Sequence, residues 1–127
     1  MPYIKPLIST ALFAILFVFS ATAQQKIQID SVGAYIGQKV TVCSKVFGTH
    51  VTKGEKPVTY LNLGAAYPNQ KLTLVIFQKD KPNFPPTPEE YYNLQEVCAT
   101  GKLKEYKGRA EMILSKKDEI EILNPLK

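Results

Sequence analysis

Short strand-like segments, interrupted by one helix signal, predict an all-β domain with one short helix, closed as a five-stranded barrel. Apolar and polar residues alternate with period two in these segments, which is typical of strands that bury one face. Clusters of Gly, Pro and Asn separate the segments. Five short strands in an open sheet would expose two edges, and closure into a barrel removes both.

The amino terminus is predicted to be a secretory signal peptide, residues 1–23. A short basic start with Lys5 precedes an apolar run over residues 7–19, and Ala-Thr-Ala at positions 21–23 supplies the small residues of a cleavage site. The apolar run is shorter than the ~20 residues of a membrane-spanning helix. An uncleaved anchor is the alternative. With cleavage, we expect export to the periplasm or the extracellular space and no stable membrane span.

The remaining residues, 24–127, are predicted to form one small domain with a single core. Only Lys5 of the 16 basic residues lies in the signal segment. The exported chain therefore carries 15 basic and 11 acidic residues, a net charge of +4. This mildly basic balance is compatible with a polyanionic partner, but charge alone does not identify one.

The first half of the domain contains a short helical turn and three predicted strands. Asp30 and Ser31 precede the turn, which Gly37 can end. In the first strand, Val40 and Val42 are expected to face the core. The strands cover residues 39–47, 58–63 and 72–77, with a polar loop over 48–57 between the first two.

A proline-rich segment and a short helix come next. Residues 79–88 contain four prolines, which excludes the interior of a strand or helix. Thr87 as N-cap, Pro88 at the first helical position and Glu90 three residues after the cap predict a capping box. The helix is expected over residues 88–94, followed by strands over 96–106 and 110–114, a tight turn at 107–108 between them, and an extended piece over 119–123.

The position of the helix favours one barrel class. A helix between the third and fourth strands that plugs the barrel is the arrangement of the OB-fold. A small barrel of SH3 type is the structural alternative, but it would not need a helix at this point. The predicted fold is therefore a five-stranded OB-fold barrel.

Three segments resemble a known family. "YIGQKVTVCSKV", "YLNLGAAYPNQKLTLVIF" and "VCATGKLKEYKGRAEMIL" are similar to small exported bacterial OB-fold domains of the nucleic-acid-binding-like, tRNA-anti-like group. The similarity covers nearly the whole chain after the signal segment, and it implies an OB-fold and a nucleic-acid ligand. Ser44 stands where the family usually has Gly, and this difference argues against a β-bulge at that position of the first strand. Ala110 stands where Pro is common.

The expected binding face is formed by the second and third strands and the loops beside them. If Leu61 and Leu63 face the core, Tyr60 and Asn62 face outward, and the same alternation turns Phe77 outward with Thr73 and Val75. Tyr60 and Phe77 would form a platform on which bases stack. The cations expected to hold phosphates on either side are Lys53, Lys56, Lys107 and Arg109.

Each of these signals has a structural alternative. Tyr60 and Phe77 would equally pack under the proline-rich loop with Phe84, because exposed aromatic side chains are usually covered. Acidic residues are mixed among the lysines, as on an ordinary solvated surface. The stretch "YLNLGAAYPNQ" is interpreted first as the connection between the second and third strands. A ligand role for its residues Asn62, Tyr67 and Asn69 is the second interpretation.

The two cysteines are predicted to form a disulfide bond. Cys43 and Cys98 lie on the first and fourth strands, which are neighbours in this barrel, and both have the outward parity. Two free, buried thiols are the alternative. His50 is expected in a polar loop without metal-ligand partners.

No motif indicates an enzyme. The one histidine, His50, is expected in a polar loop, so the sequence shows no Ser-His-Asp or Cys-His arrangement. It also contains no glycine-rich phosphate loop and no C-x-x-C motif. We expect no cofactor. The sequence predicts an exported binding module for single-stranded DNA or RNA, with a cell-envelope protein- or glycan-binding module, acting in stress or assembly, as the alternative.

Overall fold

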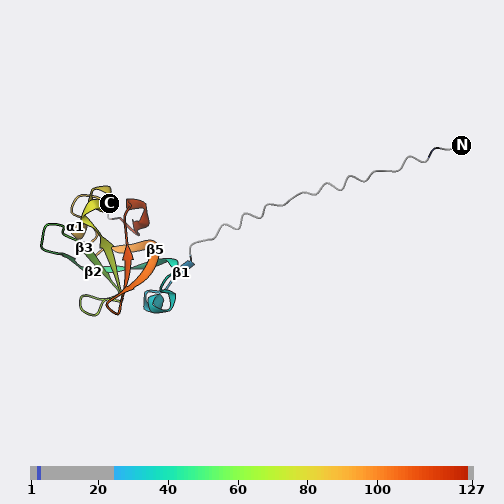
Figure 1. Ribbon diagram of the computed structural model, residues 1–127, viewed down its shortest axis with the longest axis horizontal. Helices are drawn as coiled ribbons and strands as arrows, with labels where there is room; N and C mark the ends of the chain where they lie inside the picture. The colour runs from blue at the N-terminus through green and yellow to red at the C-terminus, as the bar shows by residue number, and fades with distance from the viewer. Residues whose placement is uncertain (1–2, 4–24, 126–127) are drawn as a thin grey trace.

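The computed structural model describes Tyr3 and residues 25–125, and it shows a closed five-stranded barrel (Figure 1). The strands pair around the ring in the order β2–β3–β4–β6–β5, and β2 pairs with β5 to close it. β4 and β6 run parallel and all other neighbours in the ring run antiparallel. The predicted fold class is confirmed. The barrel strands are β2 (Lys39–Val51), β3 (Thr59–Leu63), β4 (Leu72–Ile76), β5 (Glu96–Tyr106) and β6 (Arg109–Ile113).

Two more strands extend the barrel wall. β7 (Ile120–Ile122) pairs antiparallel with β5, within the extended piece predicted at the end of the chain. β1 (Gln25–Ile27) pairs parallel with the start of β2 and was not predicted. Most of the predicted signal peptide lies outside the described residues. The helices in the described part are η1 (Ile29–Tyr35), η2 (Gln78–Asn83), α1 (Pro88–Tyr91) and η3 (Lys117–Glu119). η1 lies where a short helical turn was predicted, whereas the 3₁₀ helices η2 and η3 were not predicted.

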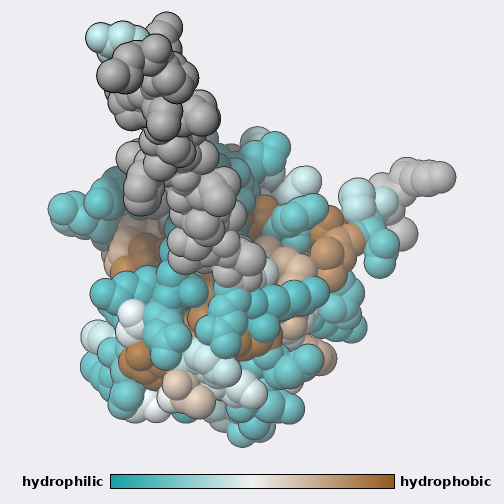
Figure 2. All heavy atoms as spheres, turned by 90° about the vertical axis from the view of Figure 1, so that its right-hand side faces the viewer, coloured by the Kyte–Doolittle hydropathy of each residue, from teal (hydrophilic) through white to brown (hydrophobic). Residues whose placement is uncertain are grey.

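The alternating apolar residues of the strands meet in one core. Leu61, Leu63, Leu72 and Leu74 are fully buried there. Each side chain of this kind stabilises the fold by about 1.5–3 kcal/mol relative to exposure. Tyr92, just after α1, belongs to the same cluster, and burial raises the pKa of its phenol to about 12, with Tyr91 adding to the shift. On the face shown in Figure 2, hydrophilic residues predominate among the coloured atoms.

The helix differs from its prediction. It covers Pro88–Tyr91 rather than residues 88–94. Thr87 does precede it, but with a φ of 48°, and its hydroxyl donates to the carbonyl oxygen of Pro86 at 2.8 Å instead of accepting from the helix. The predicted capping box is therefore wrong. The helix ends early because the chain returns to the barrel wall, where the Leu94 amide donates to the carbonyl of Val46 at 3.0 Å.

β2 is longer than predicted, and a β-bulge explains why. Val46 pairs with Leu63 but Gly48 pairs with Asn62, so Phe47 is an extra residue on β2 and is exposed. The strand continues to Val51, through residues predicted to be loop. The bulge shifts the alternation by one position, which a period-two pattern cannot follow. Ser44 lies outside the bulge, in unbroken register with β5.

The outer face of β3 and β4 is more enclosed than predicted. Asn62, Thr73 and Val75 lie on the side opposite the core residues, as expected, but only 5, 6 and 3 % of their surfaces are exposed. Val75 pairs with Tyr60 on β3 and Ile113 on β6. These residues therefore face outward, as predicted, but they are almost fully buried between the neighbouring strands.

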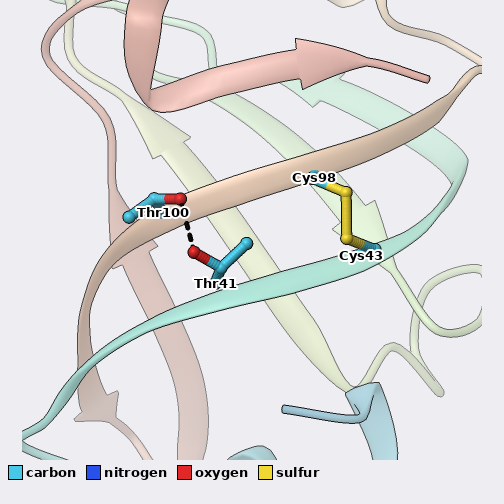
Figure 3. The surroundings of a disulfide bond; sticks show 4 residues. All are labelled: Thr41, Cys43, Cys98 and Thr100. Carbon is cyan, nitrogen blue, oxygen red and sulfur yellow. Dashed lines mark hydrogen bonds between the residues drawn. A yellow bond between two sulfur atoms is a disulfide. The ribbon is translucent and has the colours of Figure 1, made fainter. Parts of the chain in front are cut away.

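The predicted disulfide is confirmed. Cys43 and Cys98 lie directly opposite each other on β2 and β5 and are joined by a disulfide bond (Figure 3). Two residues away on the same face, Thr41 and Thr100 are also opposite each other, and their hydroxyl oxygens are 2.7 Å apart in a hydrogen bond. Two adjacent cross-strand pairs thus fasten the seam that closes the barrel.

Candidate binding cleft

A cleft of about 760 Å³ lies on the outer face of β3, and we call it the β3 cleft. Strands β2, β3, β4 and β6 form its floor, and the β3–β4 loop and the β5–β6 hairpin form its rim. Its lining residues are Gly48, Thr49, His50, Tyr60, Asn62, Ala66, Tyr67, Gln70, Thr73, Tyr106, Lys107, Arg109 and Glu111.

Strand register places a polar row across the cleft floor. Gly48 pairs with Asn62, Asn62 with Thr73, and Thr73 with Glu111. The Thr73 hydroxyl donates to Oδ1 of Asn62 at 3.4 Å. Gly48 has no side chain, and a Cβ built on it would meet nothing within 4 Å. The floor thus offers an amide, a hydroxyl and a carboxyl, and it is open at the β2 end.

An aromatic pair lies beside this row. His50 and Tyr60 are directly opposite each other, and their rings stack with centroids 6.4 Å apart and planes at 9°. The bulge at Phe47 places His50 on this face. Parallel rings on a sheet surface are a suitable platform for a flat ligand.

The rim carries two further tyrosines and two cations. Arg109 donates through Nη1 to the carbonyl oxygen of Pro68 at 2.9 Å, and its guanidinium lies 6.0 Å from the Tyr67 ring centroid. Arg109 therefore links the hairpin to the β3–β4 loop. Lys107 forms the hairpin turn with a φ of 50°, and its ammonium lies 5.3 Å from the Tyr106 ring centroid. Cation–π contacts at exposed sites stabilise by about 0.5–1 kcal/mol.

Glu111 is the acidic group of the cleft. Partial burial raises the pKa of its carboxyl, and the nearby Lys104 opposes that shift. Glu111 forms no ion pair within the described residues, where Lys81 and Glu89 are paired at 3.4 Å. Glu111 is therefore a carboxyl in the cleft whose charge is favoured by its cross-strand neighbour Lys104, although the two form no ion pair in the described residues.

Glu111→Gln is expected to keep or slightly raise stability at neutral pH. Because the folded-state pKa of Glu111 lies above its unfolded value of about 4.5, the unfolded chain ionises first and the wild type loses stability as pH rises through this range. At about pH 3 the carboxyl is protonated in both states and the difference disappears. Thermal melting of both proteins at the two pH values checks this. A lower melting temperature of the variant at neutral pH would show that Glu111 makes a stabilising contact.

The structure brings four of the predicted site residues together. Tyr60, Asn62, Lys107 and Arg109 all line the β3 cleft. The other three do not line it. Lys53 and Lys56 are exposed in the β2–β3 loop, and Phe77 is exposed just after β4. Phe84, the alternative partner of these aromatic residues, is buried in the core.

His50 and Glu111 are among the cleft residues that the sequence reasoning missed. His50 was assigned to a loop, because the bulge hides the alternation that would have placed it opposite Tyr60. Glu111 could have been identified from the sequence: it neighbours the core residue Met112 on a predicted strand, so alternation turns it outward.

Within residues 25–125 and Tyr3, no group of three His, Cys, Asp or Glu side chains is arranged to hold a metal ion. In that same part, no helix has the length and apolar character needed to cross a membrane.

No protein-family model matches the sequence, and comparison with curated proteins gave no match. Solved structures do match over most of the chain. The OBody AM1L10, bound to hen egg-white lysozyme, is 17 % identical with a TM-score of 0.53, over 84 % of this chain and 100 % of that one. RecG bound to a three-way DNA junction is 20 % identical with a TM-score of 0.53, over 82 % of this chain and 15 % of that one. These likenesses support an OB-fold-like domain.

Proposed function

We propose that the chain is an exported OB-fold binding module that takes single-stranded nucleic acid into the β3 cleft. One observation carries this proposal: the cleft combines the stacked His50–Tyr60 pair with the cations Lys107 and Arg109 above a polar floor. Flat bases, anionic phosphates and polar base edges require these three kinds of surface together.

Each part of the cleft has a role in this proposal. A base stacks beside Tyr60, where one such contact contributes about 1–3 kcal/mol. Phosphates lie along the hairpin at Lys107 and Arg109. The base edge points to the floor, where Asn62 and Thr73 offer polar groups. Because Arg109 also bonds the β3–β4 loop, the rim is held in place before a ligand arrives.

The fold alone does not select this ligand, since fold and function are separable. RecG is bound to DNA in its structure, whereas the OBody is bound to a protein. The similarity of three sequence segments to exported nucleic-acid-binding-like domains supports the nucleic-acid proposal. The composition of the cleft supports it independently.

A glycan is the second candidate, and Glu111 is the observation that favours it. A carboxylate in the cleft repels a polyanion but accepts hydrogen bonds from sugar hydroxyls, while Tyr60 would stack on a sugar ring. Binding of a neutral glycan would depend little on salt. We propose binding rather than catalysis in either case. The disulfide and the predicted signal peptide support an exported location.

The affinity for a labelled single-stranded oligonucleotide is expected to fall steeply with salt. Each phosphate contact contributes a slope of about −0.7 in a plot of log affinity against log salt concentration. Lys107→Gln removes one such contact and makes the slope shallower by about 0.7. Lys53→Gln removes an exposed lysine outside the cleft and leaves the slope unchanged. Fluorescence anisotropy with residues 24–127, which contain every described strand and helix, measures both.

Two results would count against the proposal. Absence of binding even at low salt excludes nucleic acid, and a glycan panel then tests the second candidate. Equal losses of slope in Lys107→Gln and Lys53→Gln would place the contacts over the general surface rather than in the β3 cleft.

A further inference from the structure

We propose that the β3 cleft selects bases that present N–H donors on their Watson–Crick edge, guanine first, and disfavours thymine and uracil through Glu111. This inference rests on the proposed function and adds a ligand preference to it. It stands on the acceptor groups of the cleft floor and on their position relative to the cationic rim.

The cleft offers hydrogen-bond acceptors both on its floor and on the adjoining β3–β4 loop. Oε1 of Gln70 is buried and has no hydrogen-bond partner in the described structure. The Glu111 carboxyl takes part in no hydrogen bond or ion pair found there. The Thr73 hydroxyl donates its hydrogen bond to Asn62, so its oxygen can still accept one from a ligand. Unpaired buried acceptors are costly, so a ligand that supplies donors gains from filling them.

One rim cation, Arg109, and the carboxyl of Glu111 lie on the same strand. Arg109 and Glu111 are two residues apart on β6, so both face the cleft, with Arg109 toward the hairpin and Glu111 next to Thr73. A ligand that fits has negative charge at the rim and N–H donors at the floor. A nucleotide whose base carries an amino group meets both requirements.

Base chemistry sets the expected order. Guanine presents its ring N–H and its amino group side by side, so the two oxygens of one carboxylate accept from both. Adenine and cytosine each present one amino group beside an acceptor. Thymine and uracil present one N–H between two carbonyl oxygens, which the Glu111 carboxylate repels. One good bidentate pair discriminates against the wrong base by a factor of about 5 to 150.

The test uses a short labelled oligothymidine and versions with one central guanine or hypoxanthine. A single substitution avoids the association of guanine runs. With the unaltered protein, we expect the guanine version to bind about 5- to 150-fold more tightly than oligothymidine. Hypoxanthine keeps the ring N–H but lacks the amino group, so it should lose most of that gain.

Two variants assign the preference to one carboxyl. Glu111→Gln should bring the guanine and thymine affinities together, while thermal melting confirms that it folds. Glu105→Gln removes the same charge from an exposed position on β5 outside the cleft, and it should keep the preference. Equal affinities of the unaltered protein for all three oligonucleotides overturn the inference but leave the proposed function standing. No binding of any of them removes both.

Discussion

Replacing Cys43 and Cys98 together by serine should lower the free energy of unfolding by about 4 kcal/mol. The bond joins residues 55 positions apart, and the chain-entropy model assigns a stabilisation of this size to a loop of that length. Small domains are stable by only about 5–15 kcal/mol in total, so the loss is a large part of the margin. The position matters as well, because the bond fastens β2 to β5, the pairing that closes the barrel.

Urea unfolding of three samples checks this prediction. The reduced wild type and the double serine variant should unfold at the same, lower urea concentration than the oxidised wild type. A matched control is Thr41→Val with Thr100→Val, which removes both partners of the neighbouring cross-strand hydrogen bond but keeps the side-chain shape, so the free energy of unfolding should change by less than about 1 kcal/mol. Equal midpoints for oxidised and reduced wild type would mean that the disulfide adds nothing to the closed seam.

The strand alternation was the part of the fold that the sequence predicted well. Val40 and Val42 on β2 and Val97 and Ala99 on β5 have one parity and are fully buried. The cysteines between them have the other parity, so opposite placement on neighbouring strands followed from the predicted barrel. Burial of one face fixes the register of both strands, which is why this inference was secure.

Other features depended on contacts that a local pattern does not contain. β1 is three residues long and exists because it pairs with β2. The backbone of Thr87 is left-handed, so its hydroxyl bonds Pro86 instead of the helix. The bulge at Phe47 inserts one residue and reverses which face the following residues take, and this hid His50 from the predicted site.

The stretch "YLNLGAAYPNQ" contains the connection between β3 and β4, as its first interpretation predicted, whereas the ligand role of its residues stays a prediction. Gly64 has a φ of 86°, and a Cβ there would lie 2.7 Å from the Cβ of Lys71, so its role is structural. Its amide donates to the Ser44 hydroxyl at 3.0 Å, at the position where the similar family has Gly. Yet Asn62 and Tyr67 line the β3 cleft. The sequence of this stretch predicted the turn, but only the strand register shows which of its side chains line the β3 cleft.

Gly48→Ile should weaken oligonucleotide binding by about 100-fold without loss of stability. Gly48 pairs with Asn62 at the open end of the cleft floor, and a Cβ there meets nothing within 4 Å. A branched side chain at this position projects over the floor and excludes a base from it. The expected loss corresponds to the upper end, about 3 kcal/mol, of what one stacked base contributes. Within a strand, isoleucine should add about 0.5–1 kcal/mol of stability over glycine.

Gly33→Ile is the matched control for Gly48→Ile, which is expected to block the β3 cleft. Gly33 lies in η1, outside the β3 cleft, and a Cβ there also meets nothing within 4 Å. The same side chain is thus added at an open position of the same domain, so binding should stay at the wild-type level. Anisotropy titrations and thermal melts of the three proteins separate a blocked cleft from a damaged fold. If Gly48→Ile melts like the wild type and still binds with wild-type affinity, the ligand does not occupy the β3 cleft, because its floor would then be filled while binding continues.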